Sequence, residues 1–232
     1  MNIKIILVVL FSLNFLLELC RNFFQIQKLT TIVKIIQSLL LICAIFYLFI
    51  QQILPRNLFF VPNWIVGLVL GHILYTIGFL ITVGFNSIVK NQFLSFLQVF
   101  RFSFLSPVLL GKTFTVALTE EIIYRATIQP ILIGIMGSPA IAILIVSLTF
   151  TLVHEHIFQN QLRQNIEFLI FSIIISILYH VTNDLGFVTI LHFIRNMESN
   201  YLEYLDKLQE INDPDKCMDE LERTLFEGGG VS

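Results

Sequence analysis

The stretch FTVALTEEIIYRATIQPILIGI, residues 114–135, places Glu120, Glu121 and Arg125 inside an otherwise apolar run. The rest of the chain is similarly apolar. Of its 232 residues, 56% are hydrophobic and 13% are charged, whereas an average soluble domain is about 45–50% apolar and about 25% charged. This excess predicts an all-α, polytopic integral membrane helical bundle. The three charges inside one span therefore need an explanation.

A membrane-spanning helix needs about 20 mainly apolar residues. We expect about six to eight transmembrane or partly embedded helices. The first is expected to be a retained span, because no small-residue cleavage site follows it. An interfacial helix is expected within residues 92–110, which mix aromatic and polar side chains with Arg101. The predicted spans are residues 3–20, 32–54, 64–85, 113–129, 139–156, 166–182 and 185–197.

The charges divide the chain into a basic body and an acidic tail. Residues 1–197 hold 11 Lys and Arg against 6 Asp and Glu, a net charge of +5. Residues 198–232 hold 3 against 10, a net charge of −7. Positive residues gather in the loops 21–34 and 86–112, and the positive-inside rule places these loops in the cytoplasm, together with the tail. No basic patch typical of nucleic-acid binding is present.

The tail and the cysteines add little chemistry of their own. Apolar residues at three- and four-residue spacing predict a short amphipathic helix over residues 201–211, ended by Asp213-Pro214. This helix either caps the bundle or docks a partner. The three cysteines are odd in number and unclustered, so they indicate neither a disulfide framework nor a CxxC metal site.

Helical geometry separates the three charges of the opening stretch. Glu121 and Arg125 are four residues apart, with the acid first, which favours an ion pair. Glu120 lies about 100° away around the helix. Arg125 therefore neutralises one carboxylate and leaves Glu120 to face elsewhere. A carboxylate in a dry pocket suits a general base.

Two further groups of polar residues lie on other spans. His154 closes the sequence FTLVH and is followed by Glu155 and His156, but the spacing is not that of an HExxH zinc site. His192 and Asn196 are four residues apart, so they share a helix face and can donate hydrogen bonds to a developing oxyanion. Alternation of the spans places all three groups in the same cytoplasm-side layer. A structural reading, in which these residues join helices by hydrogen bonds, stays open for each group.

Taken together, EExxxR at 120–125, FxxxH at 150–154 and HxxxN at 192–196 resemble the CPBP family of intramembrane endopeptidases. This family includes the type II CAAX prenyl endopeptidases and bacterial Abi proteins linked to bacteriocin self-immunity. The resemblance covers about residues 105–197 and implies a catalytic core there. Residues 1–104 would then be N-terminal spans with the interfacial helix, and residues 198–232 a cytoplasmic tail.

The resemblance implies a role for each motif residue. Glu120 and His154 would hold and activate the attacking water, with Glu120 as the general base. His192 and Asn196 would stabilise the oxyanion. The remaining motif residues, which would support this constellation, are Glu121, Arg125 and Phe150.

The resemblance leaves the cofactor open. The family was first labelled metal-dependent, and a glutamate–water mechanism without metal is the alternative that we favour. If zinc is bound, its expected ligands are Glu120, His154 and His192.

The expected partners are the bilayer and a peptide or protein substrate with a membrane anchor, at the cytoplasmic side of a bacterial plasma membrane. The oligomeric state is open. Two other functions compete with proteolysis. One is a non-proteolytic family member that acts in bacteriocin immunity by binding a partner. The other is a proton-coupled transporter, which would need polar residues across the whole membrane and not in one layer.

Overall fold

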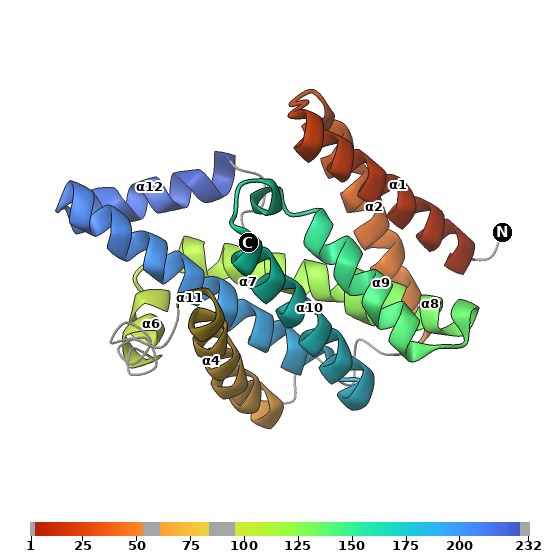
Figure 1. The fold of residues 1–232 in the computed structure, drawn as a ribbon. Coiled ribbons are helices and arrows are strands. Elements are labelled where there is room, and N and C mark those ends of the chain that lie inside the picture. Colours follow the sequence, from red (N-terminus) through yellow and green to blue (C-terminus); the bar gives the residue numbers. More distant parts are fainter. Residues whose placement is uncertain (1–2, 53–60, 84–95, 228–232) are drawn as a thin grey trace. The chain divides into compact units, whose positions relative to one another are not determined.

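The computed structural model describes residues 3–52, 61–83 and 96–227. Within these ranges all regular elements are helices and none is a strand (Figure 1). This confirms the prediction of an all-α protein. The contacts divide the helices into two units, which we describe separately. Unit 1 comprises residues 1–61 and 119–188, and unit 2 comprises residues 62–118 and 189–232.

Four described helices are long and apolar enough to cross a membrane. They are α1 (Ile3–Phe24), α2 (Leu29–Ile50), α4 (Val61–Val83) and α10 (Leu162–Thr182). A fifth candidate is bent by 104°, between α6 (Phe96–Ser103) and the continuous helix Pro107–Met136. A shorter apolar helix, α9, covers Pro139–Leu152. The protein is therefore a polytopic integral membrane protein.

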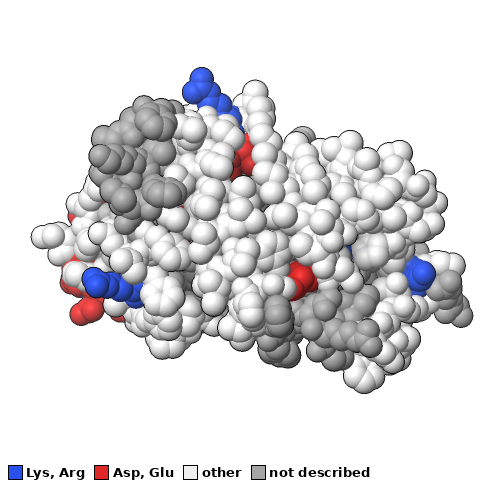
Figure 2. Space-filling model, turned by 90° about the horizontal axis from the view of Figure 1, so that it is seen from below, with Lys and Arg blue, Asp and Glu red and all other residues white. Residues whose placement is uncertain are grey.

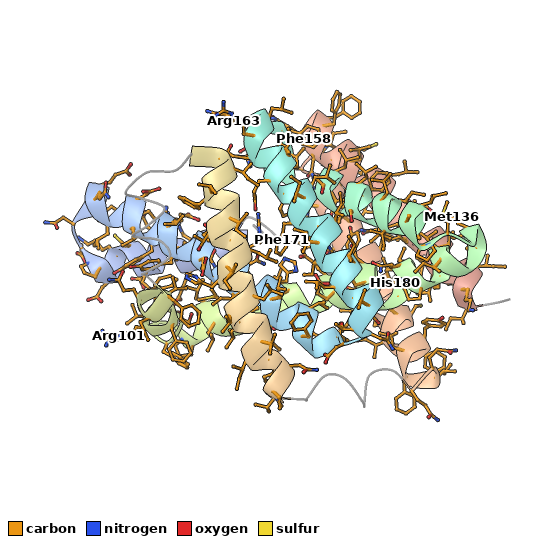
Figure 3. The ribbon with its side chains drawn as sticks, turned by 60° about the horizontal axis from the view of Figure 1, so that its bottom comes forward. Arg101, Met136, Phe158, Arg163, Phe171 and His180 are labelled. Atoms are coloured by element: carbon orange, nitrogen blue, oxygen red, sulfur yellow. The ribbon has the colours of Figure 1, made fainter. Side chains whose placement is uncertain are left out.

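The surface agrees with a lipid environment. Large apolar side chains are well exposed, including Phe49 at 69% and Val181 at 75%. Charged side chains cover little of the described surface on the face drawn in Figure 2. Arg163 and Phe158 lie near one end of α10 and His180 near the other, with Phe171 between them (Figure 3). Polar side chains thus mark the ends of this span.

The fourth predicted span contains a widened turn that the sequence analysis did not predict. Helix α7 (Pro107–Glu121) passes into a π-helix, η1 (Ile122–Ile128), and then into α8 (Gln129–Met136). The amide of Gln129 donates to the carbonyl of Tyr124, five residues earlier. Pro130 explains this turn, because proline has no amide hydrogen and its ring crowds the carbonyl four residues before it. Such π-turns are frequently found at functional sites.

The helix α9 ends at Leu152, four residues before the predicted end of the fifth span. It begins at a Ser138 side-chain cap followed by Pro139, which is a favourable helix start. A short 3₁₀ turn, η2 (Glu155–Phe158), follows its end. The prediction of a helix through residue 156 was therefore wrong. Directly after the end of α9, the carbonyl oxygen of Val153 accepts a hydrogen bond from the side-chain amide of Asn22, on α1, at 2.6 Å.

The seventh predicted span and the amphipathic tail helix form one helix, α11 (Leu185–Ile211). Asp184 caps its start by accepting a hydrogen bond from the amide of Phe187 at 2.9 Å. At 1.5 Å per residue its 27 residues extend about 40 Å. It ends at Ile211, before Asn212, whose φ is 55°, so the predicted break at Asp213-Pro214 is present, and α12 (Pro214–Glu227) begins after it.

The core of unit 2 joins the tail to the membrane body. It is one cluster of buried apolar side chains from α6, α7, α11 and α12. Its members include Phe102, Leu109, Met197, Tyr204 and Leu221. The tail helices therefore fold as part of this unit.

Candidate active site

Glu120 faces His154 within unit 1. Glu120 is the second-last residue of α7, and His154 follows the last turn of α9. The distance from Glu120 Oε1 to His154 Nε2 is 3.8 Å, and the two side chains are only 15% and 6% exposed. This distance exceeds that of a direct hydrogen bond, and a single water molecule within hydrogen-bond distance of both atoms would bridge them. The structure thus brings together the two residues that the motifs assign to the attacking water.

The backbone of α9 sets the protonation of the His154 ring. His154 Nδ1 lies 2.6 Å from the carbonyl oxygen of Phe150. A carbonyl oxygen only accepts hydrogen bonds, so Nδ1 carries the proton. In the neutral ring, Nε2 then presents its lone pair on the side of Glu120. His154 can therefore accept a hydrogen bond from a water molecule next to this carboxylate.

Phe150 is the centre of an aromatic cluster around this pair. Its side chain is completely buried. Its ring centroid lies 4.6 Å from that of His154 and 5.0 Å from that of Tyr124. The guanidinium carbon of Arg125 lies 4.1 Å from the same centroid. Phe150 thus fixes the histidine through its carbonyl and packs against the arginine through its ring.

Glu121 and Arg125 form the predicted ion pair. Arg125 Nη1 donates to Glu121 Oε1 at 3.2 Å, and both side chains are completely buried. Arg125 Nη2 also donates to Ser172 Oγ, on α10, at 3.0 Å. Buried ions need this kind of pairing and hydrogen bonding. The pair ties η1 to α10 and leaves Glu120 to face His154.

His192 and Asn196 lie on α11, within unit 2. Their spacing of four residues puts them on one face of the helix, and they are 0% and 4% exposed. Among the residues that the structure describes, none donates a hydrogen bond to Asn196 Oδ1. A buried amide oxygen of this kind calls for an explanation, such as a functional partner. The convergence of this pair with Glu120 and His154 stays a prediction.

Next to this pair, His72 and Glu198 form a buried contact between α4 and α11. His72 Nδ1 binds Glu198 Oε1, and the His72 ring packs on Phe96 with centroids 4.8 Å apart. His72 thus joins α4 to α11 through this contact. The charge count placed Glu198 in the acidic tail, yet its side chain is completely buried. No motif signalled this carboxylate.

The sequence analysis also missed three polar residues of α1. Asn14, Glu18 and Asn22 are all buried, although α1 is otherwise an apolar span. They recur every four residues, so they form a stripe along one face of the helix. This spacing could have been found in the sequence. The stripe was overlooked because it lies far from the three motifs.

Comparison with known proteins places the motifs in one segment. Residues 102–197 match the family model described as type II CAAX prenyl endopeptidase Rce1-like. This range agrees with the resemblance proposed for residues 105–197. No curated protein and no solved structure matches the chain.

Proposed function

We propose that the protein hydrolyses peptide bonds of membrane-anchored substrates. Residues 102–197 match the family model described as type II CAAX prenyl endopeptidase Rce1-like, and this match supports a CAAX-type intramembrane protease as the general class. The observation that carries the specific proposal is the facing pair of Glu120 and His154, 3.8 Å apart in a largely buried position.

In the proposed reaction, a water molecule lies between Glu120 and His154. Glu120 takes a proton from the water as its oxygen attacks the carbonyl carbon of the scissile bond. The carbonyl oxygen becomes an oxyanion, which His192 and Asn196 stabilise by hydrogen bonds. When the C–N bond breaks, the proton passes from Glu120 to the leaving amine. The products are a carboxylic acid and an amine, which exchange a proton to give a carboxylate and an ammonium ion, so water is the only co-reactant.

Glu121, Arg125 and Phe150 position this machinery without contacting the substrate. The Glu121–Arg125 pair fixes the end of α7, from which Glu120 projects. Phe150 holds the proton of His154 on Nδ1. Holding reactive groups in the geometry needed for attack is itself a large part of catalysis.

A metal-dependent version of the mechanism is the main chemical alternative. A histidine whose Nδ1 donates to a carbonyl has Nε2 available as a zinc ligand, so His154 and Glu120 suit a metal. His192 would be the third ligand. Within the described ranges, no group of three or more His, Cys, Asp or Glu side chains is arranged to hold a metal. Zinc, where bound, would polarise the substrate carbonyl or the water.

We propose the metal-independent form, since a carboxylate and an imidazole already provide a base and an orienting acceptor. Metal analysis of the active protein, with activity measured before and after treatment with 1,10-phenanthroline, separates the two forms. Activity that is lost with the chelator and restored by zinc would contradict the metal-independent form.

The proposed substrate class is a peptide with a membrane anchor, met at the cytoplasmic side of the bilayer. The family description points first to a prenylated CAAX peptide. A membrane-spanning leader peptide is the second candidate. A farnesylated peptide with a C-terminal CAAX sequence, its unprenylated form and a transmembrane peptide distinguish these classes when each is incubated with the protein in liposomes.

The deciding experiment measures the products of these peptides by mass spectrometry. We expect Glu120→Ala and His154→Ala to abolish cleavage. His180→Ala and Glu210→Ala, which change exposed residues of the same types, serve as matched controls and should cleave as the wild type does. Wild-type activity in both Glu120→Ala and His154→Ala would refute the assignment. A wild-type protein that binds these peptides but cleaves none would favour the non-proteolytic alternative.

A further inference from the structure

The polar stripe of α1 reaches the candidate active site from outside the segment that the family model matches. Asn14, Glu18 and Asn22 are 6–8% exposed, on a helix that is long and apolar enough to cross a membrane. Buried polar side chains in a membrane helix are costly, so each one is a functional hypothesis. Phe11, on the same face, packs edge-on against Tyr124 of η1 with centroids 5.5 Å apart. This face of α1 therefore contacts the helix that follows Glu120.

Two neighbouring side chains fix the orientation of the Asn22 amide. Arg21 Nη2 pairs with Glu18 Oε2 at 2.8 Å. Arg21 Nε donates to Asn22 Oδ1 at 3.0 Å. Because the oxygen of the amide accepts from the arginine, its nitrogen must point the other way. Asn22 Nδ2 donates to the carbonyl oxygen of Val153 at 2.6 Å.

The carbonyl of Val153 is one of the groups that the end of α9 leaves without a helical partner. The last four carbonyls of any helix lack an amide donor from the helix itself. In an apolar environment an unsatisfied carbonyl costs several kcal/mol, so an external donor is needed. Asn22 is that donor, and the residue that it holds directly precedes His154.

We infer that Asn22, oriented by the Glu18–Arg21 pair, is a positioning residue that holds the end of α9 so that His154 faces Glu120. This inference rests on the proposed function. It adds α1 to the site as a part that the three family motifs do not include.

The test compares matched substitutions at two positions of the same stripe. Asn22→Leu removes the donor, and Asn22→Asp keeps the size and the acceptor for Arg21 but carries no amide donor. Asn14→Leu and Asn14→Asp make the same changes two turns earlier, at a residue that is equally buried. With the farnesylated CAAX peptide, we expect the Asn22 variants to lower kcat by about 10- to 100-fold with KM unchanged, as small displacements of a catalytic group do. The Asn14 variants should keep the wild-type kcat.

A second measurement tests the contact of Asn22 without relying on peptide cleavage, so it separates this inference from the proposed function. Hydrogen–deuterium exchange of the full-length protein in liposomes reports the order of residues 150–158. We expect faster exchange there in Asn22→Leu than in the wild type or in Asn14→Leu.

Faster exchange in a protein that cleaves none of the peptides would support the positioning contact and refute the proposed function. Unchanged exchange, or an unchanged kcat in a variant series where Glu120→Ala is inactive, would overturn the inference and leave the proposed function standing.

Discussion

Two adjacent glutamates do different work because their surroundings differ. Glu121 is completely buried and paired with Arg125. Glu120 keeps some exposure and faces a histidine across a gap of 3.8 Å. The first arrangement removes both charges from solvent and compensates them. The second suits a group that must exchange a proton with a bound water.

The first prediction separates these roles by stability and activity. Glu121→Gln leaves the guanidinium of Arg125 buried without a counter-charge. Breaking a buried pair in this way costs about 3–5 kcal/mol. We therefore expect a much lower midpoint of thermal unfolding in detergent. Glu120→Gln should unfold close to the wild-type temperature and yet be inactive.

Ser172→Ala provides the scale for this comparison. It removes a hydrogen bond from the charged Arg125, which is worth about 1.5–3 kcal/mol, so its unfolding midpoint should lie between those of Glu121→Gln and the wild type. Equal stability of Glu121→Gln and Glu120→Gln would contradict the division of roles.

The residue spacing predicted some of these contacts and could not predict others. The Glu121–Arg125 pair follows from an i, i+4 spacing within one helix, which a sequence displays directly. The contact of Asn22 with Val153 joins residues 131 positions apart. No local rule gives such a partner. The spacing of Asn14, Glu18 and Asn22 marks an unusual polar stripe in an apolar helix. The residues that the stripe contacts could not be predicted from that spacing.

At the scale of elements, α4 and α11 approach closely at Gly71. A side-chain Cβ at this position would lie 2.1 Å from Ile194 Cγ2 and 2.8 Å from the carbonyl oxygen of Leu191. Both distances are shorter than atoms tolerate, and a backbone atom cannot move aside easily. Glycine is therefore required for α4 to pack on the segment of α11 that carries His192.

The second prediction follows from this contact. We expect Gly71→Ala to lower the free energy of unfolding by about 1–3 kcal/mol, as overpacked cores do. Gly111→Ala is the control, because a Cβ there meets no atom within 4 Å. Alanine favours helices over glycine by about 1 kcal/mol, so Gly111→Ala should be neutral or stabilising. Unfolding in a denaturing detergent compares the two, and an equal response would show that α4 and α11 do not pack as described.

The positions of the spans were predictable, and their ends were less so. Runs of apolar residues located α1, α2, α4 and α10 to within a few residues. The predicted span 185–197 was expected to end at residue 197, but α11 continues to Ile211. No proline or glycine separates the apolar part of α11 from its polar continuation. Directly after the end of α9, the carbonyl of Val153 is bound by Asn22, a residue from another helix.

At the scale of the molecule, the acidic tail is part of a folded unit. Leu221 is 1% exposed and Cys217 is completely buried, in the same cluster as Phe102 and Met197. Ser106, which caps the start of α7 by accepting from the amide of Leu109, also donates to Glu222 of α12. The tail thus contacts the beginning of the helix that leads to Glu120.

The third prediction tests this packing. Leu221→Ala removes buried methyl groups and should lower the free energy of unfolding by about 2–5 kcal/mol. Glu210→Ala, at an exposed position of the same tail, should have little effect. Thermal unfolding in detergent measures both. If the tail were solvated and not packed, Leu221→Ala would lower the free energy of unfolding as little as Glu210→Ala does.

The fourth prediction concerns the orientation of the chain in the membrane. Arg21, Lys28 and Lys34 flank the connection between α1 and α2, which the positive-inside rule places in the cytoplasm. The hydrogen bond from Asn22 to Val153 brings the end of α9 to the same level in the membrane as the end of α1, so both ends should lie on that side.

The orientation can be tested with single cysteines that are introduced into a cysteine-free variant and labelled on intact cells with a membrane-impermeant maleimide. We expect labelling only after permeabilisation at Gln27→Cys, Gln159→Cys and Glu210→Cys, and labelling without it at Met136→Cys and Thr182→Cys. The reverse pattern would place the candidate active site at the outer face, and the search for substrates would then move from cytoplasmic to exported peptides.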